Sequence, residues 1–427
     1  MQLNAPARGS IRAALAGASA SLLAPVTPAL AQDWKVDSAL LYYQEGDGRV
    51  RAIEPVVSVS RTDGNDRTWG AKLTFDSLTG ATPNGAVPQP GPQTFTSPSG
   101  SSTYNIQGGR LPLDPSFHDS RYALNLSFEQ PFASAKLAVG VNFSTEYDFQ
   151  SLGANVALAW DFNNRNTTLS LGTAFEKDTI NPVGGTPQPF TPAFVPGATH
   201  GPNESRNVTD LLFGVTQVLS RTWLVQGNLG FGRGSGMHTD PYKILSVVDG
   251  TTGLVTGDRY VYEQRPRSRN RTSLYLQSKS AFGTDVLDVS YRFYRDDWGI
   301  RSHTAEVRYR FESARGWYLE PQLRAYRQNA ADFWRGWLVE GGEWSSVSHT
   351  ALVANASADP RLAAFNATTL GLKFGVLLGR ASELSLRLGT YRQRQEQPGG
   401  APGALAALDL APGLKATIVV LGYWADF

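Results

Sequence analysis

Apolar and polar side chains alternate in one short stretch after another along this chain. Between 304 and 312 the odd positions are apolar, from Ala305 to Phe311, and the even positions are polar, from Thr304 to Glu312. A period of two belongs to a β-strand whose two faces meet different surroundings, and helical spacing does not fit it. The same alternation recurs at 122–128, 137–143, 287–293, 317–325, 370–376 and 384–388.

The strands that this alternation predicts are joined by connections of two kinds. The connections at one end are all short, and those at the other end include five long segments rich in Pro, Gly, Ser and Thr. The long segments are 79–118, 178–206, 236–266, 328–363 and 394–412. The predicted strands, sixteen in all, lie at 34–43, 50–61, 67–78, 119–130, 135–146, 151–162, 166–177, 207–219, 222–235, 267–282, 284–296, 301–312, 316–327, 364–379, 382–393 and 413–427.

The charge on the polar faces separates a membrane barrel from a soluble one. Glu306, Arg308 and Arg324 are among many ionisable side chains that would share the closed interior of a soluble barrel. Burying them together away from water would be very costly. In a membrane barrel the apolar face meets lipid and the charged face lines a wet lumen, with short periplasmic turns and long extracellular loops. We therefore predict an all-β fold, a transmembrane antiparallel β-barrel in the bacterial outer membrane.

Residues 1–31 have the composition of a targeting segment. The basic Arg8 and Arg12 precede a run of small apolar residues, and a small-residue exit ends at Ala31. A charged start, a short apolar middle and a small-residue cleavage site are typical of a secretory signal peptide. We predict cleavage after Ala31, which leaves residues 32–427 as a single outer-membrane barrel domain.

Composition narrows the chemistry further. The chain has no Cys, which excludes disulfides, thiolate metal sites, Cys nucleophiles and covalently attached haem. Without residues 1–31 it holds 37 basic and 37 acidic residues, so its net charge gives no reason to expect a nucleic-acid partner. The sequence contains no Gly-x-Ser-x-Gly, His-Glu-x-x-His or Gly-rich phosphate-binding motif, and we expect no cofactor.

Tryptophan residues gather at the predicted periplasmic ends of the strands. Six of the ten fall there, and amphipathic rings at the headgroup level form the aromatic girdle of outer-membrane barrels. A ring of core Trp residues is the alternative interpretation. The six are Trp34, Trp69, Trp160, Trp223, Trp317 and Trp424.

The last predicted strand ends at Phe427 and resembles the signal by which the barrel-assembly machinery recognises its clients. Gly422, Tyr423 and Phe427 match that signal, whereas Ala425 stands where an aromatic residue is usual. We therefore expect the barrel-assembly machinery as a partner, together with the lipid and lipopolysaccharide of the outer membrane.

Arginine residues recur on the predicted inward side of neighbouring strands. A barrel of this size is wide enough to leave an aqueous channel, and a basic lumen wall would attract anionic solutes. Acidic residues on the same face leave open a structural ion-pair network, and Arg side chains that clear the rim could bind lipopolysaccharide phosphate. The basic set is Arg265, Arg267, Arg269, Arg271, Arg292, Arg308, Arg310 and Arg324, and the acidic set is Asp288, Glu306, Glu312 and Glu320.

Two sparser patterns point to chemistry in the outer loops. Asp296-Asp297 near His303, and Ser302 beside it, resemble the arrangements of outer-membrane proteases and lipases, but both are common hairpin compositions. We expect no enzyme, with a hydrolase as the alternative. The His residues fall in predicted loops or at their edges, and no two have metal-ligand spacing, so we expect no metal site. They are His118, His200, His238, His303 and His349.

Several loop-to-strand segments resemble those of one bacterial family. They include Asp240-Pro241-Tyr242-Lys243, Tyr262-Glu263-Gln264-Arg265-Pro266, Asp296-Asp297-Trp298-Gly299-Ile300, Ser302-His303-Thr304, Tyr326-Arg327-Gln328 and Ala330-Ala331-Asp332-Phe333. The family is an uncharacterised, porin-like outer-membrane family of Gram-negative bacteria, a domain of unknown function. The resemblance implies an exported β-protein without an established activity or catalytic residue. The flavin-transfer and small lipoprotein genes near its members imply a periplasmic redox partner that this chain could only sheath.

The predicted function is that of a porin-like channel for small polar or anionic solutes. The alternative is a non-conducting barrel scaffold that sheathes or docks a periplasmic or redox partner. An outer-membrane hydrolase is the third hypothesis.

Overall fold

The computed structural model describes residues 33–98, 100, 102–193, 201–379 and 381–427. The predicted signal peptide, residues 1–31, lies outside them. Within the described part of the chain, the helices are two short 3-10 turns, Pro360–Leu362 and Gly403–Ala407. No helix in that part is long and apolar enough to cross a membrane.

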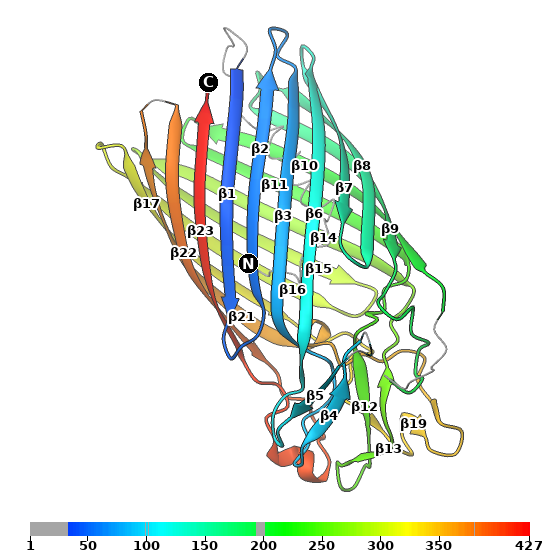
Figure 1. The fold of residues 1–427 in the computed structure, drawn as a ribbon. Helices are drawn as coiled ribbons and strands as arrows, with labels where there is room; N and C mark the ends of the chain where they lie inside the picture. Colours follow the sequence, from blue (N-terminus) through cyan, green and yellow to red (C-terminus); the bar gives the residue numbers. More distant parts are fainter. Residues whose placement is uncertain (1–32, 99, 101, 194–200, 380) are drawn as a thin grey trace.

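Sixteen antiparallel strands form a closed barrel (Figure 1). Each strand predicted from the alternation overlaps one of them, so the predicted fold class and strand count are confirmed. In order around the ring they are β1 (Asp33–Glu45), β2 (Arg51–Thr62), β3 (Thr68–Pro83), β6 (Leu113–Pro131), β7 (Ala135–Thr145), β8 (Phe149–Phe162), β9 (Thr167–Ile180), β10 (Glu204–Ser220), β11 (Trp223–Gly236), β14 (Ser268–Phe282), β15 (Asp285–Asp296), β16 (Arg301–Glu312), β17 (Trp317–Gln328), β21 (Phe365–Leu377), β22 (Ser382–Gln395) and β23 (Leu414–Asp426).

The last strand closes the ring against the first. β23 pairs with β1 from Lys35 opposite Asp426 to Glu45 opposite Ala416. The backbones of Trp34 and Phe427 exchange two further hydrogen bonds, of 3.1 and 2.8 Å. Closure satisfies the backbone donors and acceptors that an open sheet edge would leave unpaired in lipid.

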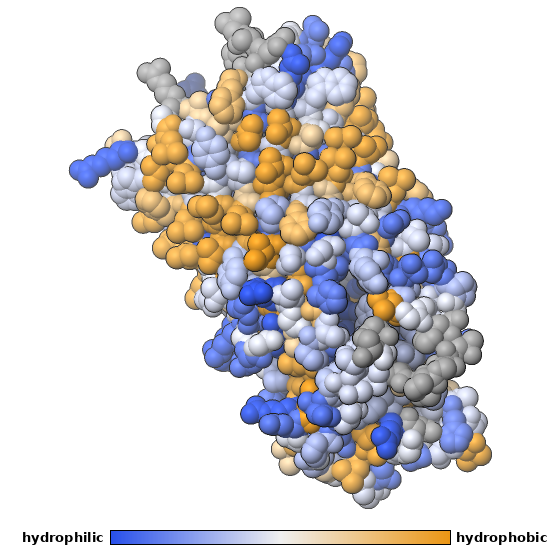
Figure 2. Space-filling model, in the orientation of Figure 1, coloured by the Kyte–Doolittle hydropathy of each residue, from blue (hydrophilic) through white to orange (hydrophobic). Residues whose placement is uncertain are grey.

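The outward faces of the strands are apolar and exposed. Leu73 is 60% exposed, Leu370 54% and Leu323 49%. On the face seen in Figure 2, apolar side chains gather in a band over the part of the barrel toward the short turns, and the surface between this band and the far end of the cap is mostly polar. So large an exposed apolar surface on a closed barrel is the surface that meets lipid. The chain is therefore an outer-membrane β-barrel.

The long loops fold together into a second structure, the cap, which comprises the described residues of 84–112, 181–203, 237–267, 329–364 and 396–413 (Figure 1). Its central strand, β12 (Ile244–Val248), is buried along its whole length. β12 pairs antiparallel with β13 (Val255–Tyr262) and parallel with β18 (Leu338–Val339). The hairpins β4–β5 (Gln93–Thr96 and Thr103–Ile106) and β19–β20 (Trp344–Ser345 and Thr350–Ala351) complete it.

The cap has its own apolar core. Leu245, Val247 and Val261 pack with Leu338 and Trp344, and none of these five side chains is more than 1% exposed. The loops are therefore held by burial of apolar surface as well as by their attachment to the strands. The sequence patterns predicted these loops as connections and did not predict these sheets.

Candidate functional site

The lumen is lined by the side chains that alternate with the lipid-facing ones, and it has two unlike walls. The charged wall consists of the inward positions of β14, β15, β16 and β17. The neutral wall consists of the inward positions between Ala138 and Ser144 of β7 and between Ser151 and Ala159 of β8, which carry only Ala, Gly, Asn and Ser side chains. β8 and β21 are diametrically opposed in the ring, so the neutral wall lies opposite β17 and β21.

Two of the four arginines expected to stack on one strand lie on the lumen face of β14. Arg269 donates to Asp296 at 2.8 and 2.5 Å, and Arg271 donates to Asp210 at 3.2 Å. Arg267 immediately precedes β14, has a side chain that is 62% exposed, and binds Glu204. These guanidinium groups therefore each sit beside a carboxylate.

Arg265 departs from the prediction, because it lies in the cap and not on the strand. Pro266 has no N–H for a ladder hydrogen bond, which explains why the strand does not extend back through it. The buried Arg265 side chain instead binds Glu263 at 2.6 Å and Asp359 at 2.7 Å. The placement of Arg265 in the lumen wall is thus corrected.

Further along the charged wall, the predicted basic and acidic residues alternate as partners. Arg308 binds Glu306, and Arg310 binds Glu312 at 3.5 Å while stacking on the ring of Tyr318. Glu320 accepts from Arg387 on β22 at 2.9 Å, and Asp288 accepts from Gln277 at 2.8 Å. Like Arg292 and Arg308, the four predicted acidic residues are at strand positions that face the lumen. They are Asp288, Glu306, Glu312 and Glu320.

Arg292 and Arg324 differ from these pairs, since neither forms an ion pair with any described residue. The guanidinium group of Arg292 lies 5.4 Å from the centre of the Tyr275 ring. Arg324 is opposite Glu306 in the strand register, but that carboxylate binds Arg308 and Gln322. The middle of the charged wall therefore holds two cations whose charge no bonded carboxylate neutralises.

The neutral wall is built from small side chains that the sequence analysis did not single out. Gly140 lies opposite Asn155, and Asn142 lies opposite Gly153. A Cβ atom at Gly140 would be 2.7 Å from the Asn155 amide oxygen, and one at Gly153 would be 2.5 Å from the Asn142 oxygen. Each Asn therefore lies over the Gly of the neighbouring strand. The inward parity of small residues in 138–159 is the signal that could have revealed this wall.

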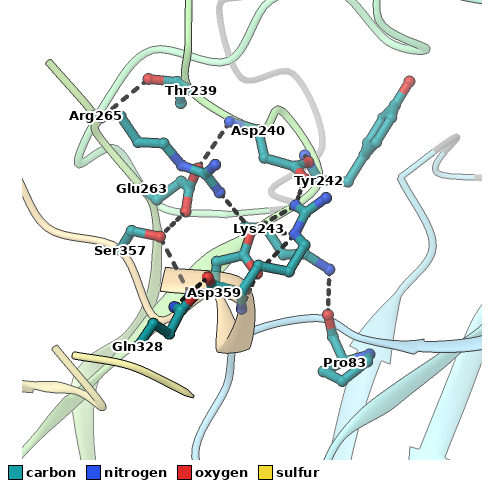
Figure 3. A network of polar contacts seen from close by, with 11 residues as sticks. Pro83, Thr239, Asp240, Tyr242, Lys243, Glu263, Arg265, Gln328, Ser357 and Asp359 are labelled. Carbon is teal, nitrogen blue, oxygen red and sulfur yellow. Dashed lines mark hydrogen bonds and ion pairs between the residues drawn. The ribbon is translucent and has the colours of Figure 1, made fainter. Parts of the chain in front are cut away.

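A buried ionic cluster lies where the cap meets the barrel (Figure 3). Glu263 and Asp359 are both within 2.7 Å of the Arg265 guanidinium group, and Glu263 also accepts from the backbone N–H of Asp240 at 2.7 Å. The ammonium group of Lys243 donates to the carbonyl oxygen of Pro83, at the end of β3. The cluster thus ties two cap loops to each other and to the barrel.

The charges of the cluster stabilise one another. Burial alone would raise the pKa of Asp240, but Arg361, Lys243 and Arg265 lower it to about 2. Burial raises the pKa of Glu263 and lowers the pKa of Lys243. Arg361 binds Asp240 at 2.6 Å and also Asp359, so the cluster contains no described carboxylate without a cation beside it.

His238 lies beside the lumen face of β11. It lies against the inward Gly234, and its ring is 5.5 Å from that of Trp298. Burial, with Arg206, Arg269 and Arg271 nearby, lowers its pKa to about 3, so the ring is neutral at ordinary pH. The described part of the chain contains no group of three His, Asp or Glu side chains that could hold a metal ion. His200 lies outside the described residues.

The residues considered for hydrolysis do not form one site. Ser302 is buried on the inward face of β16, whereas His303 is on the outward face, where its ring nitrogen is 2.7 Å from the Tyr291 hydroxyl oxygen. Asp296 points inward and binds Arg269, and Asp297 binds Asn270. Adjacent positions on one strand point to opposite sides of the barrel wall, so Ser302 and His303 cannot act on the same substrate group.

The predicted girdle contains one error. Trp424 alternates with the exposed Leu421 and Tyr423, lies opposite the inward Glu383, and therefore faces the lumen. The parity of the last strand, rather than its end, decides the direction of this ring. In the assembly signal, Tyr423 and Phe427 are exposed, and Gly422 shares the inward parity. The tryptophans with outward parity are Trp34, Trp69, Trp160, Trp223 and Trp317.

Comparison with known proteins gives one match by sequence and several by shape. A family described as "Protein of unknown function (DUF3570)" matches residues 10–425. No curated protein matches the chain.

Several solved outer-membrane proteins have a similar shape. OpdK of Pseudomonas aeruginosa is 10% identical, with 93% of this chain and 99% of that chain covered and a TM-score of 0.38. OmpT of Vibrio cholerae is 10% identical, with 94% and 100% covered and a TM-score of 0.40. CdiB of Acinetobacter baumannii is 8% identical, with 92% of this chain and a TM-score of 0.45, and the match spans 61% of CdiB.

Proposed function

The chain belongs to the family of proteins of unknown function DUF3570, and we propose that it is a porin-like outer-membrane channel for small polar solutes with a preference for anions. The observation that carries this proposal is the pair Arg292 and Arg324, which face the lumen without an ion-pair partner among the described residues. The other arginines of the charged wall share their charge with a carboxylate.

Unpaired cations on the wall of a wet lumen favour anions for an electrostatic reason. Low-dielectric walls focus the field of fixed charges, which raises the local concentration of ions of opposite sign. Rings or rows of Arg side chains select anions in pores for this reason. Arg269 and Arg271 contribute less, because Asp296 and Asp210 cancel most of their charge at a distance.

Reversal potentials in planar bilayers test the proposal. The refolded protein under a KCl gradient should pass current, with chloride preferred over potassium. Replacing both Arg292 and Arg324 by Gln should lower the chloride-to-potassium permeability ratio by about twofold or more, because the uncompensated lumen charge is removed. Arg233→Gln is the control, since Arg233 on β11 is a basic residue of the barrel wall that faces outward.

Three outcomes separate the possibilities. A ratio that falls in the double variant and not in the control supports anion preference in the lumen. An unchanged ratio in the double variant refutes the role of Arg292 and Arg324. Wild-type protein that is folded, as judged by its heat-dependent gel mobility, and yet carries no current refutes the channel.

The cap favours a second function, a closed barrel that acts as a scaffold for a periplasmic or redox partner. Its specific support is the buried ionic cluster, since Arg265, Asp359 and Glu263 tie loops across the extracellular end. A closed barrel would carry no current in the wild type and would co-purify with a periplasmic protein. Conductance in the wild type argues against this alternative.

A further inference from the structure

Basic side chains also occur on the outer surface of the barrel, near the cap ends of neighbouring strands. They share one side of the ring, from β15 through β17 and β21 to β23. We call them the basic belt. Its members, all exposed, are Arg295, Arg301, Arg327, Arg392, Arg394 and Lys415.

Strand parity places the belt beside lipid. Arg295 shares its face of β15 with the exposed Tyr291, Arg327 shares its face of β17 with Leu323, and Arg392 follows Leu388 on β22. In each strand the basic residue lies four positions beyond the apolar one, toward the cap. Four positions along a strand correspond to about 13 Å. The belt therefore lies at the extracellular border of the apolar band, at the level of lipid headgroups.

The strand register sets members of the belt directly against one another. Arg295 is opposite Arg301, and Arg392 is opposite Lys415. Arg327 and Arg394 both flank Asn366 of β21. Like charges directly across a strand pair are destabilising. Among the described residues no carboxylate forms an ion pair with any member of the belt, which contrasts with the pairing along the charged wall.

Elsewhere in the ring, the outward basic residues that the structure describes do not cluster in this way. Lys177 on β9 is outward and exposed, but its cross-strand neighbours are Leu152 and Asn207. Arg233 on β11 lies between Thr209 and Asn270. Isolated basic residues of this kind are ordinary at a membrane interface. The clustering on β15–β23 is what calls for a ligand.

We propose that the basic belt binds the phosphate groups of a phosphorylated glycolipid of the outer leaflet, the lipid A portion of lipopolysaccharide. Guanidinium groups bind phosphate oxygens in bidentate geometry, and two adjacent cations match a ligand with several phosphates. The acyl chains of such a ligand would lie against the apolar band just below the belt. The site does not depend on conduction through the lumen.

Binding of purified lipid A to the full-length protein in detergent, followed by native mass spectrometry, tests the proposal. The test variant replaces Arg295, Arg301, Arg392 and Lys415 by Gln. We expect its affinity for lipid A to fall about tenfold or more, with a steeper salt dependence in the wild type. The control variant Lys177→Gln with Arg233→Gln removes isolated outward charges and should bind lipid A like the wild type.

Ligand variants identify the phosphate source. Monophosphoryl lipid A should bind the wild type more weakly than bisphosphorylated lipid A, and phosphatidylglycerol or inorganic phosphate more weakly still. Equal binding of phosphatidylglycerol and lipid A would overturn the assignment to a glycolipid. Equal lipid A affinity of the belt variant and the wild type would overturn the site. If the belt variant does not fold, the comparison of the two lipid A forms on the wild type decides the matter.

Discussion

Asp359 offers the sharpest test of how the cap is held in place. Its carboxylate is 1% exposed, accepts from Arg265 at 2.7 Å and from the backbone N–H of Arg361 at 2.9 Å, and also binds the Arg361 side chain. Asp359→Asn keeps the shape of the side chain and removes the negative charge. The substitution leaves the buried Arg265 and the half-exposed Arg361 with fewer anions around them.

The size of the effect follows from the partners that remain. Removing one member of a buried ion pair costs about 3–5 kcal/mol when its partner is left unpaired. Arg265 keeps Glu263 and Arg361 keeps Asp240, so the cost should lie near the lower end of that range. A loss of about 3 kcal/mol corresponds to about a hundredfold increase in cap opening.

Hydrogen exchange of β12 measures that opening, because its five residues are buried in the centre of the cap. The barrel strands should keep their protection, since Asp359 touches none of their lipid-facing side chains. Asp249→Asn is the matched control: Asp249 is also in the cap, but its side chain accepts from Thr251 and Thr252 in an exposed turn and binds no cation among the described residues. Equal exchange rates for β12 in the two variants would refute the proposed role of the buried cluster.

Acid and the chain terminus provide two further predictions. The pKa of Asp240 is lowered to about 2, so its stabilisation of the cap is complete above its unfolded value of about 3.9 and is lost as the pH falls through about 2. Pepsin should therefore cleave the cap faster as the pH falls from about 3.9 to about 2. The raised pKa of Glu263 acts in the opposite direction at higher pH, because burial disfavours its charged form. A cleavage rate that stays constant over this pH range would contradict the prediction. Phe427→Ala should lower the amount of heat-modifiable barrel in outer membranes, because the exposed Phe427 ring directly follows β23, the strand beside β1, and normal levels would argue against an assembly signal there.

The strands could be predicted because the alternation of apolar and polar residues lies within each strand. The alternation within 304–312 is enough to predict that this segment is a strand with one apolar and one polar face, whatever the rest of the chain contains. The cap could not be predicted in this way. β12 is an unbroken run of buried residues whose partners, β13 and β18, follow it in the chain at very different separations. A run of five such residues fits several kinds of element.

For the candidate site, the sequence could predict which side chains point into the lumen but could not predict which ion pairs they form. The inward direction of Arg292 and Arg324 follows from alternation alone, and so would the inward direction of Trp424 had its neighbours been considered. The bond between Arg269 and Asp296 depends on strand register and side-chain conformation, which alternation does not specify. For the same reason the sequence did not reveal which arginines would be left without a carboxylate.

Because the two walls of the barrel differ, charge is distributed unevenly across its lumen. Arg324 on β17 carries a positive charge, while Gly140 on β7, the strand diametrically opposite, carries none. A dipolar molecule in that space is turned until its negative end points at Arg324. In the proposed channel, two isomers of equal size and net charge would therefore cross in different orientations and make different contacts on the way.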